Sequence, residues 1–535
     1  MVPDVDVLIV GAGPVGLALA IELGQRGIAC RVVERNDRVG YSPRAKMTNV
    51  RTREHLRRWG IADALRAASP MPAGYPSTVV FATRMNGPLL ARFEDAFNCT
   101  TTRNDLYAEG GQWVPQYTLE EVLRVHAVSL ASVTVDFDTT LTGATADADG
   151  VTSTLQDAAG THTVRSRYLV GADGAGSAVR RLIGVKLEGP GAIASNLNVV
   201  FRSHALAGLH RHGPAIMYWM VNDDVPALLG PMSGDGLYFF MATKLATAGL
   251  ISDADVPALI RRSTGLDLDV EVVGIDPWNA HQLIAERYSH GRIYLAGDAC
   301  HLHPPFGGFG MNMGVGDAVD LGWKLAATLQ GWGGAALLDS YEAERRPVHA
   351  WVMAEATANY ATVGNQLTLA GIEDRGPLGD ATRREAADTI NTTKIREIRS
   401  LGTVKGYRYA GSPIVAPDGT AAPVRQGMAY IPSAHPGCVA PHLWLADGSS
   451  LYDHFGAGFS VLVTDPGAEA GALCEAAARR GVPMTLIEPG DVRLRARYGA
   501  ALAIIRPDQH VAWRGDTLPG DLDALLDTIT GRTYP

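Results

Sequence analysis

Two glycine-rich segments hold the residues of this chain whose types and spacing could support cofactor chemistry. In the first, GAGPVG, Gly11, Gly13 and Gly16 have the GxGxxG spacing. The second begins at Gly297 and reads GDACHLHPPFGGFGMNMGVGDAVDLGWK. Glycines at such spacing let a backbone turn tightly and approach a pyrophosphate at the N-terminus of a helix. The first segment therefore indicates that the chain binds a dinucleotide. Which dinucleotide it binds has to be inferred from the second segment.

The elements around the first segment stand in the order that a dinucleotide site needs. The apolar run Val5–Val10 predicts a buried strand, and an apolar-periodic helix follows to about Arg26. A second strand, Ala29–Val33, ends at Glu34, whose carboxylate can accept hydrogen bonds from an adenosine ribose. The alternative is a ligand-free turn where a helix packs close to a sheet. This unit alone does not separate NAD from FAD.

Composition narrows the class of protein. A chain of 535 residues with 46% hydrophobic residues predicts two or three globular domains. A net charge of -9 without a basic run argues against nucleic acid or an anionic membrane as the main partner. The five cysteines include no CxxC pair, which favours the cytoplasm. The apolar stretch from Val5 to Leu23 is interrupted by Asp6, Pro14 and Glu22, so we expect no signal or membrane segment.

The rest of the chain predicts an interrupted first domain and a separate C-terminal region. A second strand and helix pattern starts at 292–295 and continues through Leu329, whereas residues 190–280 are mostly strand-like. We interpret the β-rich insertions as a substrate domain. After a passage rich in proline and glycine, strands at Phe459–Val463 and Ala501–Ile505 flank a helix at Gly467–Arg480.

Five motifs together resemble one known family. They are GAGPVG, PRA at Pro43–Ala45, GADGAGSAVR, the segment from Gly297, and YEAERRP at Tyr341–Pro347. The chain resembles the class A flavoprotein aromatic hydroxylases, which include para-hydroxybenzoate hydroxylase and phenol hydroxylase. CVAPHLWL, SLYDHFGAGFSVLV and IIRPDQHVAWR resemble the thioredoxin-like tail of the longer members. Without CxxC, a redox role for that tail has no support.

The resemblance implies an α/β architecture: an interrupted Rossmann-like FAD-binding domain of the glutathione reductase type, an inserted β-rich substrate domain and a C-terminal thioredoxin-like domain. We expect a catalytic region at 1–400 and a linker with the C-terminal domain at 401–535. Within the catalytic region, we assign FAD binding to 1–73, 103–190 and 281–360, the substrate domain to 74–102 and 191–280, and a helical segment to 361–400.

The resemblance also implies the residues that contact FAD. Glu34 would hold the ribose, Arg44 the pyrophosphate, Gln116 the flavin chain and Asp298 the ribitol hydroxyls, while Asp173 and Arg180 match a motif linked to both FAD and the nicotinamide. The complete predicted set is Gly11, Gly13, Pro14, Gly16, Glu34, Arg35, Arg44, Gln116, Asp173, Arg180, Gly297, Asp298, Gly310, Met311, Asn312 and Met313. Asp298 could instead be a plain helix cap, and Gln116 and Arg180 could each satisfy a local backbone group.

The helix expected to begin near Gly310 would serve the reaction through its backbone. Unpaired amides and the positive end of a helix dipole stabilise negative charge on the pyrimidine edge of a reduced flavin. We therefore expect Pro304, Pro305, Gly310 and Asn312 to form the flavin environment of the catalytic site. The spacing marks no residue as a base for proton transfer.

Substrate and metal ligands are less evident. Strand candidates at 216–223 and 236–242 make Met217, Tyr218, Trp219 and Tyr238 possible pocket residues, with His303 beside them, although aromatic residues on strands more often form core. Alternation puts Tyr218 and Met220, or Met217 and Trp219, on one face. His301 and His303 lie two apart, but no further ligand completes a metal site, so we predict no metal.

The resemblance implies an FAD-dependent monooxygenase that hydroxylates a small phenolic compound, monocyclic or fused, with NADH or NADPH and dioxygen through a flavin hydroperoxide. Alternatives are Baeyer-Villiger or epoxidase chemistry and a non-catalytic nucleotide-binding protein. A halogenase is disfavoured because none of the nine tryptophans supplies a Trp-x-Trp-x-Ile-Pro segment. We expect a cytoplasmic monomer or homodimer with no nucleic-acid or membrane partner.

Overall fold

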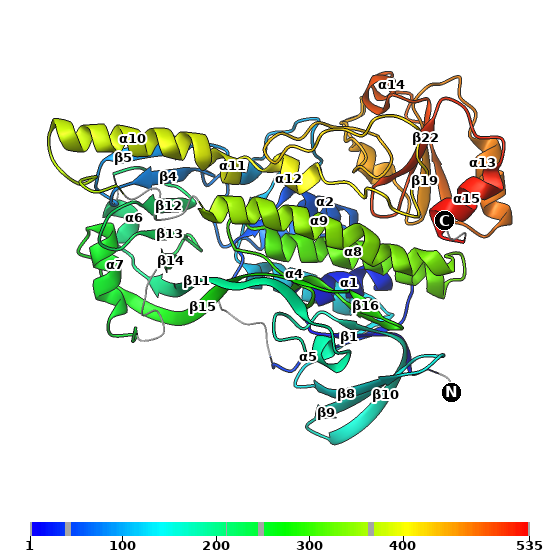
Figure 1. The fold of residues 1–535 in the computed structure, drawn as a ribbon, viewed down its shortest axis with the longest axis horizontal. Coiled ribbons are helices and arrows are strands. Elements are labelled where there is room, and N and C mark those ends of the chain that lie inside the picture. Colours follow the sequence, from blue (N-terminus) through cyan, green and yellow to red (C-terminus); the bar gives the residue numbers. More distant parts are fainter. Residues whose placement is uncertain (1–2, 38–43, 210, 244–250, 362–368, 533–535) are drawn as a thin grey trace.

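The computed structural model describes residues 3–37, 44–209, 211–243, 251–361 and 369–532. Two large sheets and one small sheet are joined by a pair of long, adjacent helices, α8 (Phe309–Leu329) and α9 (Ala335–Ala361), which run through the middle of the molecule (Figure 1). This mixed α/β architecture agrees with the fold class expected from the sequence.

The first sheet carries the N-terminal glycine-rich turn. Its main path is β16 (Ser289–His290), β17 (Ile293–Leu295), β10 (Gly160–Gly171), β1 (Val5–Val10), β2 (Cys30–Val33) and β7 (Val133–Asp136), and β9 (Val151–Asp157) joins β10 to β8 (Thr140–Ala146). The five strands from β17 to β7 are parallel. Their carboxyl ends therefore meet at one edge, where open α/β sheets bind their ligands.

Helices cover this edge and one face of the sheet. Helix α1 (Pro14–Gly24) is buried almost all round because it packs between the sheet, α4 (Gln116–Ser129) and α8. Smaller elements complete the region: α2 (Val50–Arg58), α3 (Ala62–Ala67), α5 (Ala178–Leu182), the two-stranded pair β3 (Met47–Thr48) and β6 (Gln112–Trp113), and the short helix η1 (Ala96–Asn98).

The second sheet has eight strands and two different faces. Its order is β18 (His301–Leu302), β15 (Glu271–Ala285), β11 (Leu187–Arg202), β14 (Leu237–Thr243), β13 (Ala227–Pro231), β12 (Met217–Met220), β4 (Val79–Ala82) and β5 (Leu89–Phe93). One face packs with α6 (Leu206–Leu209) and α7 (Val256–Thr264). The other, which we call the inner face, packs with Met47, Trp113 and Phe306 near the start of α8.

The C-terminal region forms a third sheet with its own helices. Strand β19 (Phe459–Val463) is parallel to β20 (Met484–Ile487), whereas β21 (Leu502–Ile505) and β22 (Val511–Gly515) complete the sheet in antiparallel fashion. Helices α13 (Gly471–Arg479), α14 (Arg493–Tyr498) and α15 (Leu522–Thr530) and the short helix η4 (Leu451–His454) surround it, and α10 (Pro377–Thr393), α11 (Ile395–Ile398) and α12 (Leu401–Lys405) precede it. The arrangement fits the expected thioredoxin-like fold.

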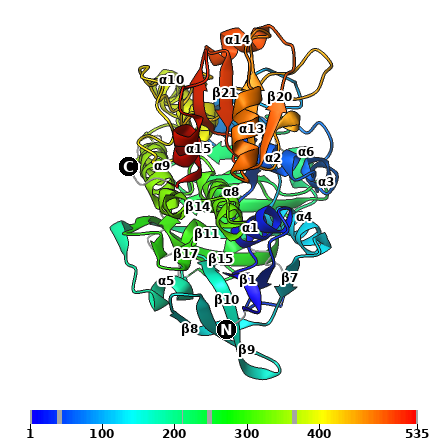
Figure 2. The ribbon, with the colours of Figure 1, turned by 90° about the vertical axis from the view of Figure 1, so that its right-hand side faces the viewer.

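This C-terminal domain packs directly on the long helices. Figure 2 shows it on one side of α8 and α9, with the first sheet on the other. Trp323 of α8 and Leu337 of α9 belong to the same buried cluster as Phe459 and Ile504 of the small sheet. The two regions therefore share one hydrophobic core. In the part of the chain that the structure describes, we find no helix with the length and apolarity needed to cross a bilayer.

Candidate functional site

The turn after β1 combines two glycines required by packing with one that leaves open space. Gly11 has φ +106°, and a Cβ there would lie 2.4 Å from the carbonyl oxygen of Ala172. A Cβ on Gly16 would lie 1.9 Å from the carbonyl oxygen of Gly11, whereas one on Gly13 would meet nothing within 4 Å. No side chain caps the helix that Pro14 begins. Its first amides are thus available to an anion beside Gly13.

Glu34 lies at the end of β2, where the sequence places it. Its Oε2 accepts a hydrogen bond of 3.0 Å from the amide of Ala12, and its Oε1 accepts bonds from the amide and side chain of Asn36. These bonds hold the carboxylate over the glycine-rich turn and leave lone pairs for ribose hydroxyls. The neighbouring Arg35 is exposed.

Asp298 follows β17 in a short helical turn, η3 (Gly297–Ala299). Gly297 has φ +64°, and its amide donates to Asp317. The side chain of Asp298 accepts no hydrogen bond from any described residue, and burial raises its pKa against the opposing charges of His301 and Arg44. A carboxylate whose oxygens have no hydrogen-bond donor within the protein can accept hydrogen bonds from ligand hydroxyl groups.

Asp173 and Arg180 brace the loop after β10. Oδ2 of Asp173 accepts hydrogen bonds from the amides of Ala178 and Val179 at the start of α5, while its buried Oδ1 has no partner within the described ranges. Arg180 donates to the carbonyl oxygens of Ala299, at 2.8 Å, and Ala175, at 2.7 Å. Arg180 therefore ties this loop to the Gly297 segment and satisfies backbone groups, the alternative that the sequence left open.

The side chain of Gln116 is hydrogen-bonded within the protein, whereas that of Arg44 is exposed. Oε1 of Gln116 accepts a hydrogen bond from the amide of Ala45, and its Nε2 donates to Glu120. Gln116 therefore positions the segment that carries Arg44, and it could affect a cofactor through that segment. The side chain of Arg44 is exposed and lies close enough to Asp298 to lower its pKa. Pro43 lies outside the described residues.

The start of α8 has the open, uncapped backbone that the sequence predicts. Gly308, the N-cap residue, has φ +65° and Gly307 has φ +100°, so both adopt conformations that favour glycine. A Cβ on Gly310 would meet nothing within 4 Å. The first turn of α8 therefore has no capping side chain, and the Cβ position of Gly310 adjoins open space.

Asn312 fixes this turn against the rest of the site. Its Nδ2 donates to the carbonyl oxygens of Met47 and Gly308, and its Oδ1 accepts from the amide of Asn49. The side chain is thus fully used in holding β3 beside the helix, and any contribution of Asn312 to a cofactor comes from its backbone. Of the other residues predicted here, Pro14, Pro304 and Met313 are buried, and Pro305 and Met311 are half-buried.

A buried ionic cluster, to which the sequence assigned no role, supports the second glycine-rich segment. Asp317 of α8 accepts hydrogen bonds from Arg345 Nε at 2.7 Å, from His301 at 2.9 Å and from the amide of Gly297 at 3.0 Å. Burial alone would raise the pKa of Asp317, but Arg345 and the neighbouring histidines hold it well below the ordinary value. Asp317 and Arg345 stand in the motifs GVGDAVD and YEAERRP, which was the only sequence signal for them.

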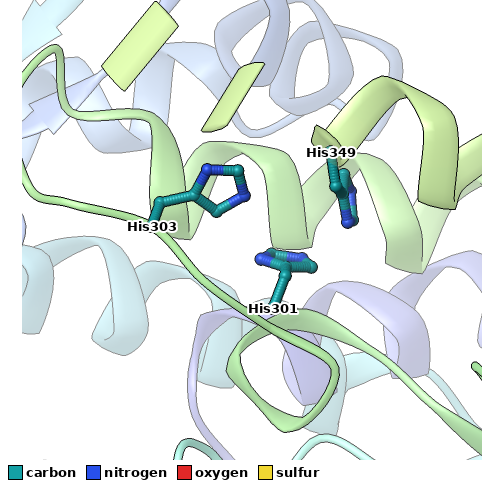
Figure 3. A group of neighbouring side chains, drawn as sticks. All are labelled: His301, His303 and His349. Atoms are coloured by element: carbon teal, nitrogen blue, oxygen red, sulfur yellow. The ribbon is translucent and has the colours of Figure 1, made fainter. Parts of the chain in front are cut away.

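Three histidines converge above this cluster. Figure 3 shows His301, His303 and His349 pointing toward a common space, and one nitrogen of each lies within 4.8 Å of the others. His349, however, bonds Tyr288 through Nδ1 and Asp317 through Nε2, and burial lowers its pKa to about 3. Its two nitrogens are therefore already occupied, which makes it a poor metal ligand. The absence of a metal stays a prediction.

The inner face of the second sheet separates the predicted substrate residues into two groups. Met217 and Trp219 lie on the inner face, where Trp219 stacks on Phe81 with ring centroids 5.4 Å apart. Tyr218 and Tyr238 lie on the opposite face with α7, and the hydroxyl of Tyr218 donates to the carbonyl oxygen of Gly213. The structure therefore does not bring these two tyrosines to the site. The substrate roles of Met217, Trp219 and His303 remain predictions.

Two residues that the sequence did not single out link this face to the glycine-rich loop. The Nζ atom of Lys394 lies 4.5 Å from the ring centroid of Trp219 and donates to Glu397 at 3.0 Å. Glu397 also accepts a hydrogen bond of 3.2 Å from the amide of Gly307. Both side chains are buried, so this ion pair positions the loop from which α8 starts. Lys394 and Glu397 lie far from that loop in the sequence, so no local pattern predicted the contact.

The arrangement fits FAD. Open space at Gly13 and Gly310 adjoins two uncapped helix N-termini, which suit the pyrophosphate and the flavin respectively. Between them, Glu34 and Asp298 present carboxylates at the ends of two parallel strands, suited to sugar and ribitol hydroxyls.

Comparison with known proteins gives matches over nearly the whole chain. Residues 4–356 match the family described as FAD binding domain, and residues 433–533 match the family described as aromatic-ring hydroxylase, C-terminal. The tetracenomycin A2 monooxygenase-dioxygenase of Streptomyces glaucescens is 34% identical over 99% of this chain and 97% of its own length.

Solved structures give the same result. The rebeccamycin biosynthetic enzyme RebC with reduced flavin has a TM-score of 0.91 and 33% identity, with 99% of both chains covered. Aklavinone-11 hydroxylase, solved as a ternary complex with FAD and aklavinone, has a TM-score of 0.87 and 30% identity and covers 99% of this chain and 100% of its own.

Proposed function

Because this chain belongs to the family of FAD-dependent aromatic-ring hydroxylases, we propose that it acts on a fused-ring phenol, with NADH or NADPH as reductant and dioxygen as the source of the inserted oxygen. FAD and aromatic hydroxylation follow from the family. The size of the substrate and the nicotinamide are the parts that we add.

FAD supplies the redox chemistry, taking electrons from the reduced nicotinamide and activating dioxygen for transfer of one oxygen atom to the ring. The residues of this chain hold and orient it. The amides of α1 beside Gly13 suit the pyrophosphate, and Glu34 and Asp298 suit the hydroxyls. The first turn of α8 at Gly310 offers amides to a negative charge. Pro304 and the apolar inner face exclude water from the reacting ring.

The extent of the inner face is the observation that carries the fused-ring proposal. One row of directly paired residues crosses the sheet from Trp219 through Leu228 and Met241 to Asn198 and Asp276. Four strand spacings make this row about 19 Å long. A single phenol ring would cover about a third of this row, whereas three or four fused rings would cover about half of it or more. Trp219 and Phe81 stack on each other at one end of the row and give that end an aromatic lining.

Two of the relatives agree with this size, although another, 32% identical over 98% of this chain, is named as a 4-methyl-5-nitrocatechol 5-monooxygenase and so for a single-ring compound. The names of the tetracenomycin A2 enzyme and of the aklavinone-11 hydroxylase complex identify fused-ring compounds as their ligands or substrates. A cytoplasmic location is part of the proposal and is supported by five cysteines that are all free thiols. A monomer or homodimer stays the expected oligomeric state.

The test is oxidation of NADH or NADPH by the FAD-loaded protein with phenol, 1-naphthol or 1-hydroxyanthraquinone, followed by mass analysis of each mixture. We expect the fused-ring compounds to accelerate oxidation and to gain one oxygen atom with the ring skeleton intact. Acceleration by phenol alone would contradict the fused-ring proposal. A ring-expanded product would instead show Baeyer-Villiger chemistry, and an epoxide would show epoxidase chemistry.

Two neighbouring positions provide matched variants. Trp219→Leu removes the stacking partner of Phe81 on the inner face, so we expect it to weaken binding of 1-hydroxyanthraquinone more than that of phenol. Tyr218→Phe changes only a hydroxyl on the opposite face and should behave as wild type. Equal effects of the two variants would argue against the inner face as the substrate surface.

A further inference from the structure

Two buried hydrogen-bond donors lie side by side at the β15 end of the inner face. Asn196 on β11 is directly opposite Trp278 on the antiparallel strand β15. Asn196 has the same parity along β11 as Val200, an inner-face residue, and Trp278 packs against the same cluster. Cβ atoms of such an opposed pair are about 5 Å apart. The amide group of Asn196 and the indole of Trp278 therefore share one small region.

Neither donor is satisfied by the protein. Asn196 is 1% exposed, yet its Nδ2 has no hydrogen-bond partner among the residues that the structure describes. The Nε1 of Trp278 is buried and likewise lacks a partner there. By contrast, the Nε1 atoms of two other tryptophans on this face have partners: Trp113 donates to the carbonyl oxygen of Pro231, and Trp219 donates to the sulfur of Met217. Buried N–H groups are normally paired, so two orphans in one place indicate a missing acceptor.

From this pair, we propose that Asn196 and Trp278 form a subsite for a carbonyl oxygen of the substrate, as found in a quinone or ring ketone. This inference rests on the proposed fused-ring function and specifies it further. A carbonyl oxygen has two lone pairs and can accept both N–H groups at once. The subsite would fix which ring of the substrate lies at the β15 end and, by exclusion, which ring lies near Trp219.

The charges nearby favour a neutral acceptor over an anion. The next pair on the same face is Asn198 opposite Asp276, one step along both strands from the donors. Asp276 would repel a carboxylate or phosphate bound beside it. The two donors themselves are uncharged, so they offer no compensating attraction. A carbonyl group is uncharged and its oxygen accepts hydrogen bonds, so it suits this place on both grounds. A hydrocarbon ring accepts no hydrogen bond and would leave both donors unpaired.

The experiment compares two ligands that differ in quinone oxygens. 1-Hydroxyanthraquinone and 1-hydroxyanthracene are titrated into the FAD-loaded protein, and binding is followed by calorimetry. Trp278→Phe keeps the aromatic packing without the indole N–H, and Asn196→Leu keeps the branching without the amide. We expect each to weaken binding of the quinone roughly tenfold and to leave the hydroxyanthracene unchanged.

Trp323→Phe is the matched control. Its Nε1 is also buried without a partner among the described residues, but Trp323 lies in the core shared with the C-terminal domain. This variant should bind both ligands as wild type does. The lost N–H bonded no described residue, so the melting temperature of the ligand-free Trp278→Phe protein should fall only by the packing lost with the smaller ring.

Each result decides the question. Equal loss of both ligands, or no loss of the quinone, would overturn the carbonyl subsite. If no fused-ring phenol stimulates nicotinamide oxidation by the wild-type protein, the proposed function itself fails. If stimulation persists while Trp278→Phe and Asn196→Leu bind both ligands normally, only the subsite fails.

Discussion

The polar side chains at and near the ends of the parallel strands differ in whether they have hydrogen-bond partners within the protein. Glu34 is held by Ala12 and Asn36, whereas Asp298 accepts no hydrogen bond from a described residue. Gln116 and Arg180 are committed to backbone groups. Residue type and motif position alone predict all four as cofactor contacts. The hydrogen bonds show that Asp298 has no partner within the described residues, whereas Glu34, Gln116 and Arg180 each have one; that Asp298 contacts FAD stays a prediction.

Asp298→Asn should weaken FAD binding roughly tenfold to a hundredfold, because hydrogen bonds to a charged acceptor are lost. Burial raises the pKa of Asp298, so wild-type affinity should fall as the pH is lowered through that raised pKa and the anion is protonated. The variant does not titrate and should show a flatter dependence. Fluorescence titration of the FAD-free protein over a pH series measures both effects.

Asp465→Asn is the corresponding control at the residue scale. Asp465 follows β19 in the C-terminal domain, as Asp298 follows β17, but it caps the amide of Gly467 instead of facing the cofactor site. Its FAD affinity should match wild type at every pH. Equal behaviour of the two variants would show that Asp298 does not contact FAD.

Among the elements, α8 has two kinds of glycine. Gly314 lets the helix approach the first sheet, since a Cβ there would lie 2.6 Å from Val15 and 3.1 Å from the Cα atom of Gly297. Gly310, one turn earlier, has no such contact. Gly314 therefore allows close packing, whereas Gly310 leaves space at the start of the helix that a cofactor can occupy.

Gly310→Ala should therefore separate folding from cofactor binding. The ligand-free variant should be as stable as wild type or more stable by about 0.5–1 kcal/mol, because alanine favours a helix over glycine. FAD affinity should fall, since the methyl group enters the open space. Urea unfolding without FAD and a binding titration measure the two effects.

Gly471→Ala supplies a matched comparison in the first turn of α13, where a Cβ also meets nothing within 4 Å. It should gain similar stability and keep full FAD affinity. If Gly310→Ala also keeps full affinity, the start of α8 is not the flavin contact. Gly314→Ala, with its close contacts, should lower stability even without FAD.

The strand and helix patterns could be read from the sequence because they depend on local periodicity. Strands Val5–Val10 and Phe459–Val463 have the bounds expected, and α8 ends at Leu329 as predicted. Contacts between residues far apart in the sequence could not be predicted in this way. Alternation on β12 gave two possible faces, and only the pairing with β4 and β13 places Trp219 inside and Tyr218 outside. The contact between Glu397 and Gly307 joins residues that share no local pattern.

At the scale of the whole molecule, the C-terminal domain completes a buried ionic network of the catalytic helices. Arg506 donates to Glu344 of α9 at 2.5 Å and to Asp320 of α8 at 3.0 Å, and all three side chains are fully buried. Lys324 donates to the same two carboxylates. Arg506 also pairs with Asp508 of its own domain, so the C-terminal domain contributes one cation and one anion to this network and ties itself to α8 and α9.

Arg506→Leu should lower the free energy of unfolding by about 3–5 kcal/mol, because removing one partner leaves buried charges uncompensated. Chemical unfolding followed by fluorescence tests this. Arg493→Leu breaks a pair with Asp491 in which the arginine is half exposed, and it should cost less than about 1 kcal/mol. If the two variants lose equal stability, Arg506 does not hold the domains together.

The same network sets an order of events during biosynthesis. Glu344 and Arg506 are 162 residues apart, which a ribosome covers in roughly 8–32 s. During that interval the newly made α8 and α9 carry Asp320, Glu344 and Lys324 without Arg506, the partner of the two carboxylates. The first sheet is complete in sequence once β17 has been made, whereas its covering helices gain this contact only after Arg506 has been made. We therefore expect translation pauses between Glu344 and Arg506 to prolong the interval in which Glu344 and Asp320 lack their arginine partner.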